Sequence, residues 1–233
     1  MRSTCWPGSD RRASGARTGR APPHPAASSP AAPRRAYPRR VLIYSMSVTL
    51  DGYVTDRAGS FGWSAPSEEQ FRFSLAQIGE LGAYLCGRRL YETMLPWETD
   101  PLMRRTALGD AFADVWAALP KVVFSRTLDR VEGNARLATR PVPDEVAAAV
   151  AGTDRDVSVG GADLAAQVIA LGLLDEVRAF RNPLVAGGGT PFLPPVEEPV
   201  PLDLVDTRPF AGRVVYERYR VLRPAQDPAG RPA

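Results

Sequence analysis

Apolar residues occur along the chain in short runs and at helical spacing, and the two patterns alternate from residue 41 onward. Continuous apolar and β-branched runs predict buried strands. We expect such strands at 41–48, 83–86, 121–125, 135–139, 156–159, 175–185, 200–206 and 213–222. Apolar positions three or four residues apart predict helices. We expect helices at 67–80, 101–118, 143–151 and 162–173, and one more that begins at Gly87.

Strands that alternate with helices predict an α/β fold with a mostly parallel central sheet flanked by helices. The last two strands follow each other without a helix, which predicts an antiparallel C-terminal edge. We therefore expect one domain over residues 39–223. A disordered tail rich in Arg, Pro and Ala would precede it at 1–38, and a frayed polar tail would follow it at 224–233.

The basic character of the chain is confined to its beginning. Residues 1–40 contain nine arginines and one aspartate, a formal charge of +8, so a whole-chain charge of +3 leaves −5 for the rest. A basic tail can bind nucleic acid or anionic lipid, and an organellar transit peptide or an upstream start codon is a further alternative. We interpret the tail as an unstructured extension, and expect a cytoplasmic protein with no nucleic-acid or membrane partner.

The distribution of histidine and cysteine excludes several mechanisms. The single histidine, His24, and one of the two cysteines, Cys5, lie in the tail, and Cys86 lies in an apolar run. The domain therefore has no Ser-His-Asp or Cys-His machinery and no His-based metal site, and we expect no bound metal. Proton transfer would need a carboxylate, a tyrosine, the lone Lys121 or water.

Two junctions pair a strand end with glycine and a helix start: Cys86-Gly87-Arg88-Arg89 and Val159-Gly160-Gly161-Ala162-Asp163. Glycine lets a ligand approach the backbone, and the N–H groups at a helix start attract phosphate. Either junction alone is more typical of a plain tight turn between strand and helix. Together they favour a dinucleotide site, although the Rossmann G-x-G-x-x-G pattern is absent.

Four further features allow both a ligand-binding and a purely structural interpretation. Ser125-Arg126 follows a strand, where the arginine would stack on adenine, pair with a 2′-phosphate, or simply lie in solvent. Asp51-Gly52 is either a turn or part of a site, and Trp63 is either a hydrophobic plug or part of a ligand lid. The three glycines at 187–189 permit a sharp turn or a close approach to a ligand.

The ordered set of motifs resembles the dihydrofolate reductase-like family, in particular the C-terminal reductase domain of bacterial riboflavin-biosynthesis deaminase–reductases. The resemblance covers about residues 40–223. It rests on SVTLDGY (47–53), the Trp63 loop, CGRRLYETM (86–94), VVFSRTL (122–128), VGGADLAAQVIALGLLDE (159–176), NPLVAGGGTPF (182–192) and VVYERYRV (214–221). The zinc signature of the deaminase domain is absent, so the chain looks most like a stand-alone member.

The resemblance implies an NADPH-dependent oxidoreductase that transfers a hydride to a pyrimidine-like or pterin-like small molecule, and we expect it to be a homodimer. Gly87, Arg88 and Arg89 would hold phosphates of NADPH at one helix start. The pyrophosphate would bind at Gly160, Gly161, Ala162, Asp163 and Leu164, and the adenosine end at Ser125 and Arg126. Asp51, Gly52 and Trp63 would lie in a loop over nicotinamide and substrate. The 187–190 turn and Asn182 would back the sheet or contribute to a dimer contact.

The sequence departs from the family pattern at two positions. Leu90 stands where a threonine usually follows the two basic residues, and Val159 stands where riboflavin-pathway reductases carry an acid. The helix after the tryptophan loop offers Glu68 or Glu69 as the carboxylate that dihydrofolate reductases place there. Asp51 is the first candidate for the catalytic group, and Glu69 is the second. The expected activity is that of a 5-amino-6-(5-phosphoribosylamino)uracil reductase, with dihydrofolate reduction or non-catalytic NADPH binding as alternatives.

Overall fold

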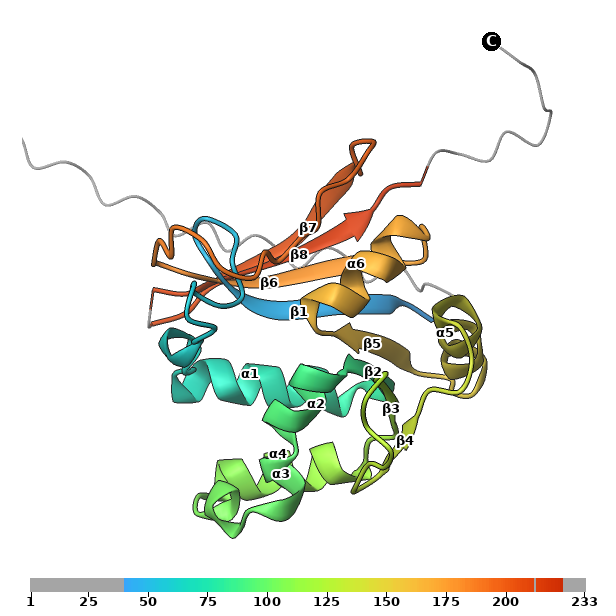
Figure 1. Ribbon diagram of the computed structural model, residues 1–233. Helices are drawn as coiled ribbons and strands as arrows, with labels where there is room; N and C mark the ends of the chain where they lie inside the picture. Colours follow the sequence, from blue (N-terminus) through green and yellow to red (C-terminus); the bar gives the residue numbers. More distant parts are fainter. Residues whose placement is uncertain (1–39, 212, 224–233) are drawn as a thin grey trace, which may run out of the picture. The chain divides into compact units, whose positions relative to one another are not determined.

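A computed structural model describes residues 40–211 and 213–223 (Figure 1). The predicted tails at 1–38 and 224–233 lie outside these residues, so the domain boundaries stay a prediction. The strands are β1 (Leu42–Thr49), β2 (Leu81–Gly87), β3 (Lys121–Phe124), β4 (Ala135–Leu137), β5 (Asp156–Gly160), β6 (Glu176–Asn182), β7 (Leu202–Pro209) and β8 (Val215–Val221). The α-helices are α1 (Glu68–Gly79), α2 (Arg88–Met94), α3 (Pro96–Thr99), α4 (Ala107–Ala118), α5 (Val142–Ala151) and α6 (Ala162–Ala170).

All eight strands form one sheet in the order β4-β3-β2-β5-β1-β6-β8-β7. The first six strands of that order run parallel, whereas β8 pairs antiparallel with β6 and with β7. The chain skips β5 between β1 and β2, and skips β1 between β5 and β6. This arrangement confirms the predicted α/β fold with its antiparallel C-terminal edge.

The helices cover both faces of the sheet, as Figure 1 shows. On one face the core contains Val157, Val159 and Leu85 and packs against α5 and α6. On the other face, Ile43 and Cys86 pack with aromatic residues of α4 and with apolar residues of α1. Burial raises the pKa of the Cys86 thiol to about 12, so it stays protonated in this core.

Local signals decide where the predicted elements begin and end. Ser67 starts α1, because its hydroxyl accepts a hydrogen bond from the Gln70 N–H. The helix expected over 101–118 begins only at Ala107, where Thr106 caps it, and a 3-10 turn precedes it. The strand expected to reach 185 ends at Asn182, because Pro183 follows and lacks an N–H for the ladder.

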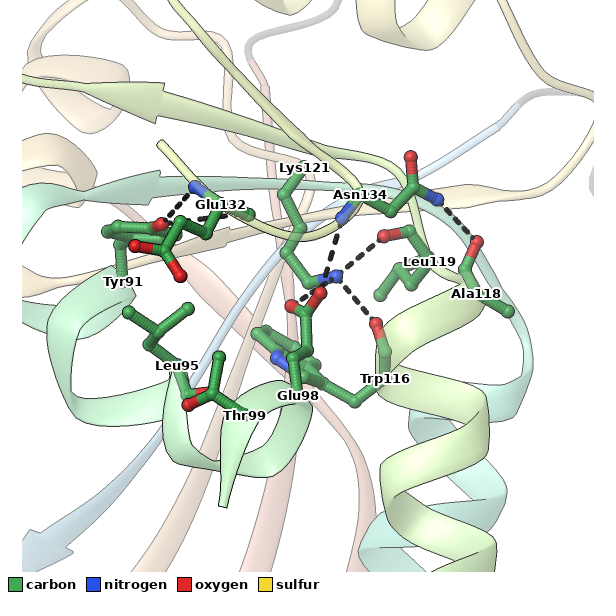
Figure 2. Close-up of polar contacts among 10 residues, drawn as sticks. All are labelled: Tyr91, Leu95, Glu98, Thr99, Trp116, Ala118, Leu119, Lys121, Glu132 and Asn134. Atoms are coloured by element: carbon green, nitrogen blue, oxygen red, sulfur yellow. Dashed lines mark hydrogen bonds and ion pairs between the residues drawn. The ribbon is translucent and has the colours of Figure 1, made fainter. Parts of the chain in front are cut away.

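A buried ion pair fixes the amino end of β3 (Figure 2). The Lys121 ammonium lies 2.9 Å from a carboxylate oxygen of Glu98 and donates to the carbonyls of Trp116 and Leu119. The other oxygen of Glu98 accepts from the Asn134 N–H at 3.2 Å. These contacts join α3, α4, β3 and the loop before β4. The sequence left Lys121 open as a group for proton transfer, and the structure shows that its ammonium forms a structural ion pair instead.

Candidate active site

The carboxyl ends of three neighbouring strands meet at one edge of the sheet. The chain leaves β3 at Ser125, β2 at Gly87 and β5 at Gly161, and these strands are adjacent in the order β3-β2-β5. A cleft of about 1520 Å³ opens there and extends beneath α1. Clefts at the carboxyl ends of parallel strands are where α/β proteins bind ligands. Nine predicted cofactor residues line it, namely Gly87, Arg88, Arg89, Ser125, Arg126, Gly161, Ala162, Asp163 and Leu164.

The structure brings the two glycine junctions face to face. Gly161 has a φ of +92°, and a Cβ on it would lie 3.7 Å from the Gly87 backbone nitrogen. Gly160 packs so closely against Leu90 and Tyr84 that a side chain there would displace one of them. No side chain of the described residues caps the start of α6. The first N–H groups of that helix are therefore available to an anion at the cleft.

The arginines at this edge differ in their partners. Arg88 is held between two neighbours, donating to Glu92 (2.7 Å) and to the Thr127 hydroxyl (2.6 Å). The side chains of Arg89 and Arg126 make no hydrogen bond or ion pair with any residue that the structure describes, and both are exposed at the cleft. Two unpaired guanidinium groups beside a pair of helix starts suit a polyanionic ligand.

Ser125 shapes the turn that carries Arg126. Its hydroxyl accepts hydrogen bonds from the Thr127 N–H (3.1 Å) and the Leu128 N–H (3.0 Å), which closes the turn directly after β3. The Ser125 hydroxyl therefore stabilises the turn, and Arg126 is the residue of this turn that carries a charge.

Arg140 also lines the cleft, and the sequence did not single it out. It pairs at 3.2 Å with Glu145, which is fully buried and also binds Arg136 and the Thr139 N–H. The hydrogen bond from Arg136, followed by the other donors, lowers the pKa of Glu145 to about 2. The carboxylate therefore stays charged and fixes the segment between β4 and α5 at the rim of the cleft.

Asp51 joins two loops and does not line the cleft. Its carboxylate accepts from the Thr49 hydroxyl (2.7 Å), the Ala186 N–H (3.0 Å) and the Gly187 N–H (2.7 Å). These hydrogen bonds, led by that from Thr49, lower its pKa to about 2. Gly52, with a φ of +87°, forms the turn beside it. The structure thus places both residues in a loop contact, and their predicted roles toward substrate and cofactor stay predictions.

The structure also places Glu69 and Trp63 outside the main cleft. Glu69 pairs with Arg208 at 2.9 Å on the exposed side of α1, and this hydrogen bond lowers its pKa. Trp63 lines a smaller cavity of about 230 Å³ together with Gln70 and Asn182. Its indole N–H is buried and has no hydrogen-bond partner among the described residues. The loop that carries Trp63 does reach the cleft, through Phe61 and Ser64. The catalytic role expected of Glu69 stays a prediction.

The inner part of the cleft, between α1 and strands β1 and β6, has a polar lining that the sequence did not single out. Its polar members are Ser45, Ser47, Gln70, Ser74, Gln77 and Arg178. We refer to this part, lined by those six residues, as the inner arm. Two signals in the sequence could have revealed it. Gln70, Ser74 and Gln77 are spaced as one helical face, and Arg178 stands between the apolar residues Val177 and Ala179 of a strand.

Comparisons with known proteins agree with this architecture. Residues 40–216 match the model of the RibD C-terminal domain family. The chain is 30% identical over 185 residues to the uncharacterized protein YyaP of Bacillus subtilis (strain 168), covering 76% of this chain and 93% of that protein.

Solved structures with the same fold carry riboflavin-biosynthesis descriptions. A putative riboflavin biosynthesis protein from Shewanella sp. PV-4 has a TM-score of 0.64 at 20% identity, covering 78% of this chain and 99% of that one. The diaminohydroxyphosphoribosylaminopyrimidine deaminase/5-amino-6-(5-phosphoribosylamino)uracil reductase of Thermotoga maritima has a TM-score of 0.56 at 18% identity. That match covers 79% of this chain and 57% of the bifunctional protein. Within the described residues, no helix is long and apolar enough to cross a membrane.

Proposed function

Because the chain belongs to the RibD C-terminal domain family, we propose that it is an NADPH-dependent reductase similar to 5-amino-6-(5-phosphoribosylamino)uracil reductase. Its reaction would transfer a hydride to a pyrimidine-like or pterin-like substrate. The observation that carries the proposal is the meeting of Gly87 and Gly161 at the cleft, flanked by two arginines whose side chains have no partner among the described residues.

The residues at this edge suit a dinucleotide. Backbone groups at Gly161, Ala162 and Asp163 would bind the pyrophosphate, because no Cβ fills the space beside Gly87 and the start of α6 faces the cleft. Arg89 and Arg126 would bind the further phosphate that distinguishes NADPH from NADH. Arg88 is already engaged by Glu92 and Thr127, so its part would be to hold the start of α2 against the turn after β3.

NADPH would supply a hydride to an electrophilic carbon, and the protein would supply binding and orientation. The only tyrosine at the cleft is Tyr84 among the described residues, and burial raises its pKa, so its hydroxyl stays protonated. The inner arm contains no carboxylate among its described lining residues. The proton that completes the reduction would then come from water that reaches the cleft or from the substrate itself.

Cofactor binding is tested by titrating the full chain with NADPH and NADH and following protein fluorescence. We expect saturable binding with a preference for NADPH. Arg126→Ala should weaken NADPH binding about tenfold and leave NADH binding unchanged, because a charge-assisted contact contributes about 1.5–3 kcal/mol. Arg130→Ala is the matched control, since Arg130 is an exposed arginine of the same loop outside the cleft lining. If neither nucleotide binds, the proposal is wrong.

Dihydrofolate reduction and non-catalytic nucleotide binding are the alternatives. Val159 is fully buried in the core and Leu90 packs against Gly160, so the two departures from the family pattern have structural roles. Loss of NADPH absorbance with the ribosylaminopyrimidine but not with dihydrofolate would separate the first two activities. NADPH binding without turnover of either would favour the non-catalytic alternative. The homodimer and the cytoplasmic location stay predictions.

A further inference from the structure

The inner arm runs beneath α1, and its polar groups are arranged along the helix. Gln70, Ser74 and Gln77 follow each other at intervals of four and three residues and all line the cleft. At one end, the Gln77 amide donates to the Tyr216 hydroxyl at 2.8 Å. Gln77 lies seven positions after Gln70, so the polar row is about 10 Å long. This length suits a small heterocycle with one substituent.

Gln70 is a nearly buried residue whose side chain lines the cleft. The residue is 3% exposed, and its side chain makes no hydrogen bond within the described part of the chain. It lines both the main cleft and the smaller cavity beside Trp63. The amide is open to the cavities, since it is not among the fully buried side-chain groups that lack a partner in the described residues. The position therefore suits a ligand that offers both a donor and an acceptor.

Arg178 brings an excess of positive charge to the same arm. The residue is 7% exposed, and its Nε donates to one oxygen of Glu176 at 2.6 Å. The other oxygen of that carboxylate binds Arg218 at 2.7 Å. One carboxylate thus serves two guanidinium groups. The terminal amino groups of Arg178 have no partner among the described residues. Arg178 lines the cleft beside Ser45, its register partner on the neighbouring strand β1.

The acidic residues of the cleft lie elsewhere. Among the described lining residues, the carboxylates are Glu92 of α2 and Asp163 of α6. Both belong to the edge where the glycine junctions meet, and Glu92 is paired with Arg88. None of the described residues that line the inner arm carries a negative charge to offset that of Arg178.

The chemistry of these two groups selects a class of ligand. A primary amide has one donor side and one acceptor side, so it pairs with a lactam edge, –NH–C=O, through two hydrogen bonds. A protonated amidine edge presents donors alone and needs a carboxylate. We infer that the inner arm recognises a lactam-bearing heterocycle through Gln70 and an oxyanion of the same molecule through Arg178, and that it rejects cationic amidine rings. The inference rests on the proposed function insofar as the bound ring is the one to be reduced.

Three probes with one ring test it by calorimetry on the full chain. Uracil carries the lactam edge, orotate adds a carboxylate to the same ring, and 2,4-diaminopyrimidine is cationic in mildly acidic buffer. We expect orotate to bind tightest and diaminopyrimidine weakest. Arg178→Met should lower orotate affinity about tenfold, to that of uracil, and leave uracil unchanged. Gln70→Glu should weaken the binding of uracil and strengthen the binding of diaminopyrimidine.

Arg218→Met is the matched control, because it removes a guanidinium from the same carboxylate without changing the cleft lining. It should change the affinity for orotate by no more than about twofold. Arg218 does not line the cleft, so the effect of its charge on a ligand there is screened. NADPH titration of the wild-type chain tests the proposed function. The same titration of each variant shows whether that variant is folded. If NADPH binds but wild-type protein holds diaminopyrimidine as tightly as orotate, or Arg178→Met leaves orotate unchanged, the inference is overturned and the proposed function stands.

Discussion

Lys121 and Arg178 are both buried cations on strands of one sheet, and their surroundings are opposite. Lys121 has a carboxylate and two carbonyls within hydrogen-bond distance, and it lies 4.8 Å from the centre of the Trp116 ring. Arg178 shares one carboxylate with Arg218, and its terminal amino groups have no partner in the described chain. A charge whose donors are satisfied stabilises the architecture, whereas a buried charge with unused donors in a cleft indicates a ligand.

The location of each cation agrees with this distinction. Lys121 lies at the amino end of β3, where Figure 2 shows it enclosed by α3, α4 and the 132–134 loop. Arg178 lies in the middle of β6, on the face that turns toward α1 and the cleft. The cation at the amino end of β3 is thus fully paired within the protein, whereas Arg178 keeps terminal amino groups without a partner among the described residues.

The largest effect is expected from Lys121→Met. It leaves the Glu98 carboxylate, whose side chain is 7% exposed, without its counter-charge. Removing one partner of a buried pair costs about 3–5 kcal/mol, so the free energy of unfolding in urea should fall by that amount. The double variant Lys121→Met/Glu98→Gln should recover a large part of the loss. A loss below about 1 kcal/mol in the single variant would show that the pair is not structural.

An intermediate effect is expected at Glu145, whose carboxylate is paired at the rim of the cleft. Its pKa in the folded chain is lowered to about 2 from 4.5, so its contribution is present above pH 4.5 and is lost as the pH falls toward 2. The contribution is about 2 kcal/mol, because the two arginines that bind it are half-exposed and screened. Glu145→Gln should remove that amount at neutral pH and flatten the acid part of the stability profile.

The measurement is urea unfolding at several pH values for the wild-type chain and for Glu145→Gln. The difference between the two curves isolates Glu145 from other carboxylates with lowered pKa values, such as Asp51. A difference that does not change between neutral pH and acid would contradict the assignment.

The smallest effect on stability is expected from Arg178→Met. Glu176 keeps its pairing with Arg218, so no buried carboxylate is left without a cation. The free energy of unfolding should change by about 1 kcal/mol or less, since a half-satisfied guanidinium is replaced by an apolar chain of similar length. The same variant should lose its preference for orotate. If Arg178→Met destabilises the protein as much as Lys121→Met, the two cations play the same role and the comparison fails.

Much of the fold could be predicted because each element carries its own signal. The apolar runs at 41–48 and 156–159 and the cap at Ser67 are local features, and the structure has β1, β5 and α1 there. The short helix α3, Pro96–Thr99, has no hydrophobic pattern of its own and was not predicted. Its position depends on the ion pair between Glu98 and Lys121, residues 23 apart in the chain.

The sequence by itself determined the α/β alternation, the antiparallel edge, and the two glycine junctions, because these follow from periodicity and from the backbone freedom of glycine. Only the tertiary structure decided which polar residues face the cleft. Glu69 and Gln70 are neighbours in the chain, yet the helix turns Glu69 toward Arg208 and Gln70 into the cleft. The direction of a side chain depends on which face of the helix the sheet covers, and that is set by residues distant in sequence.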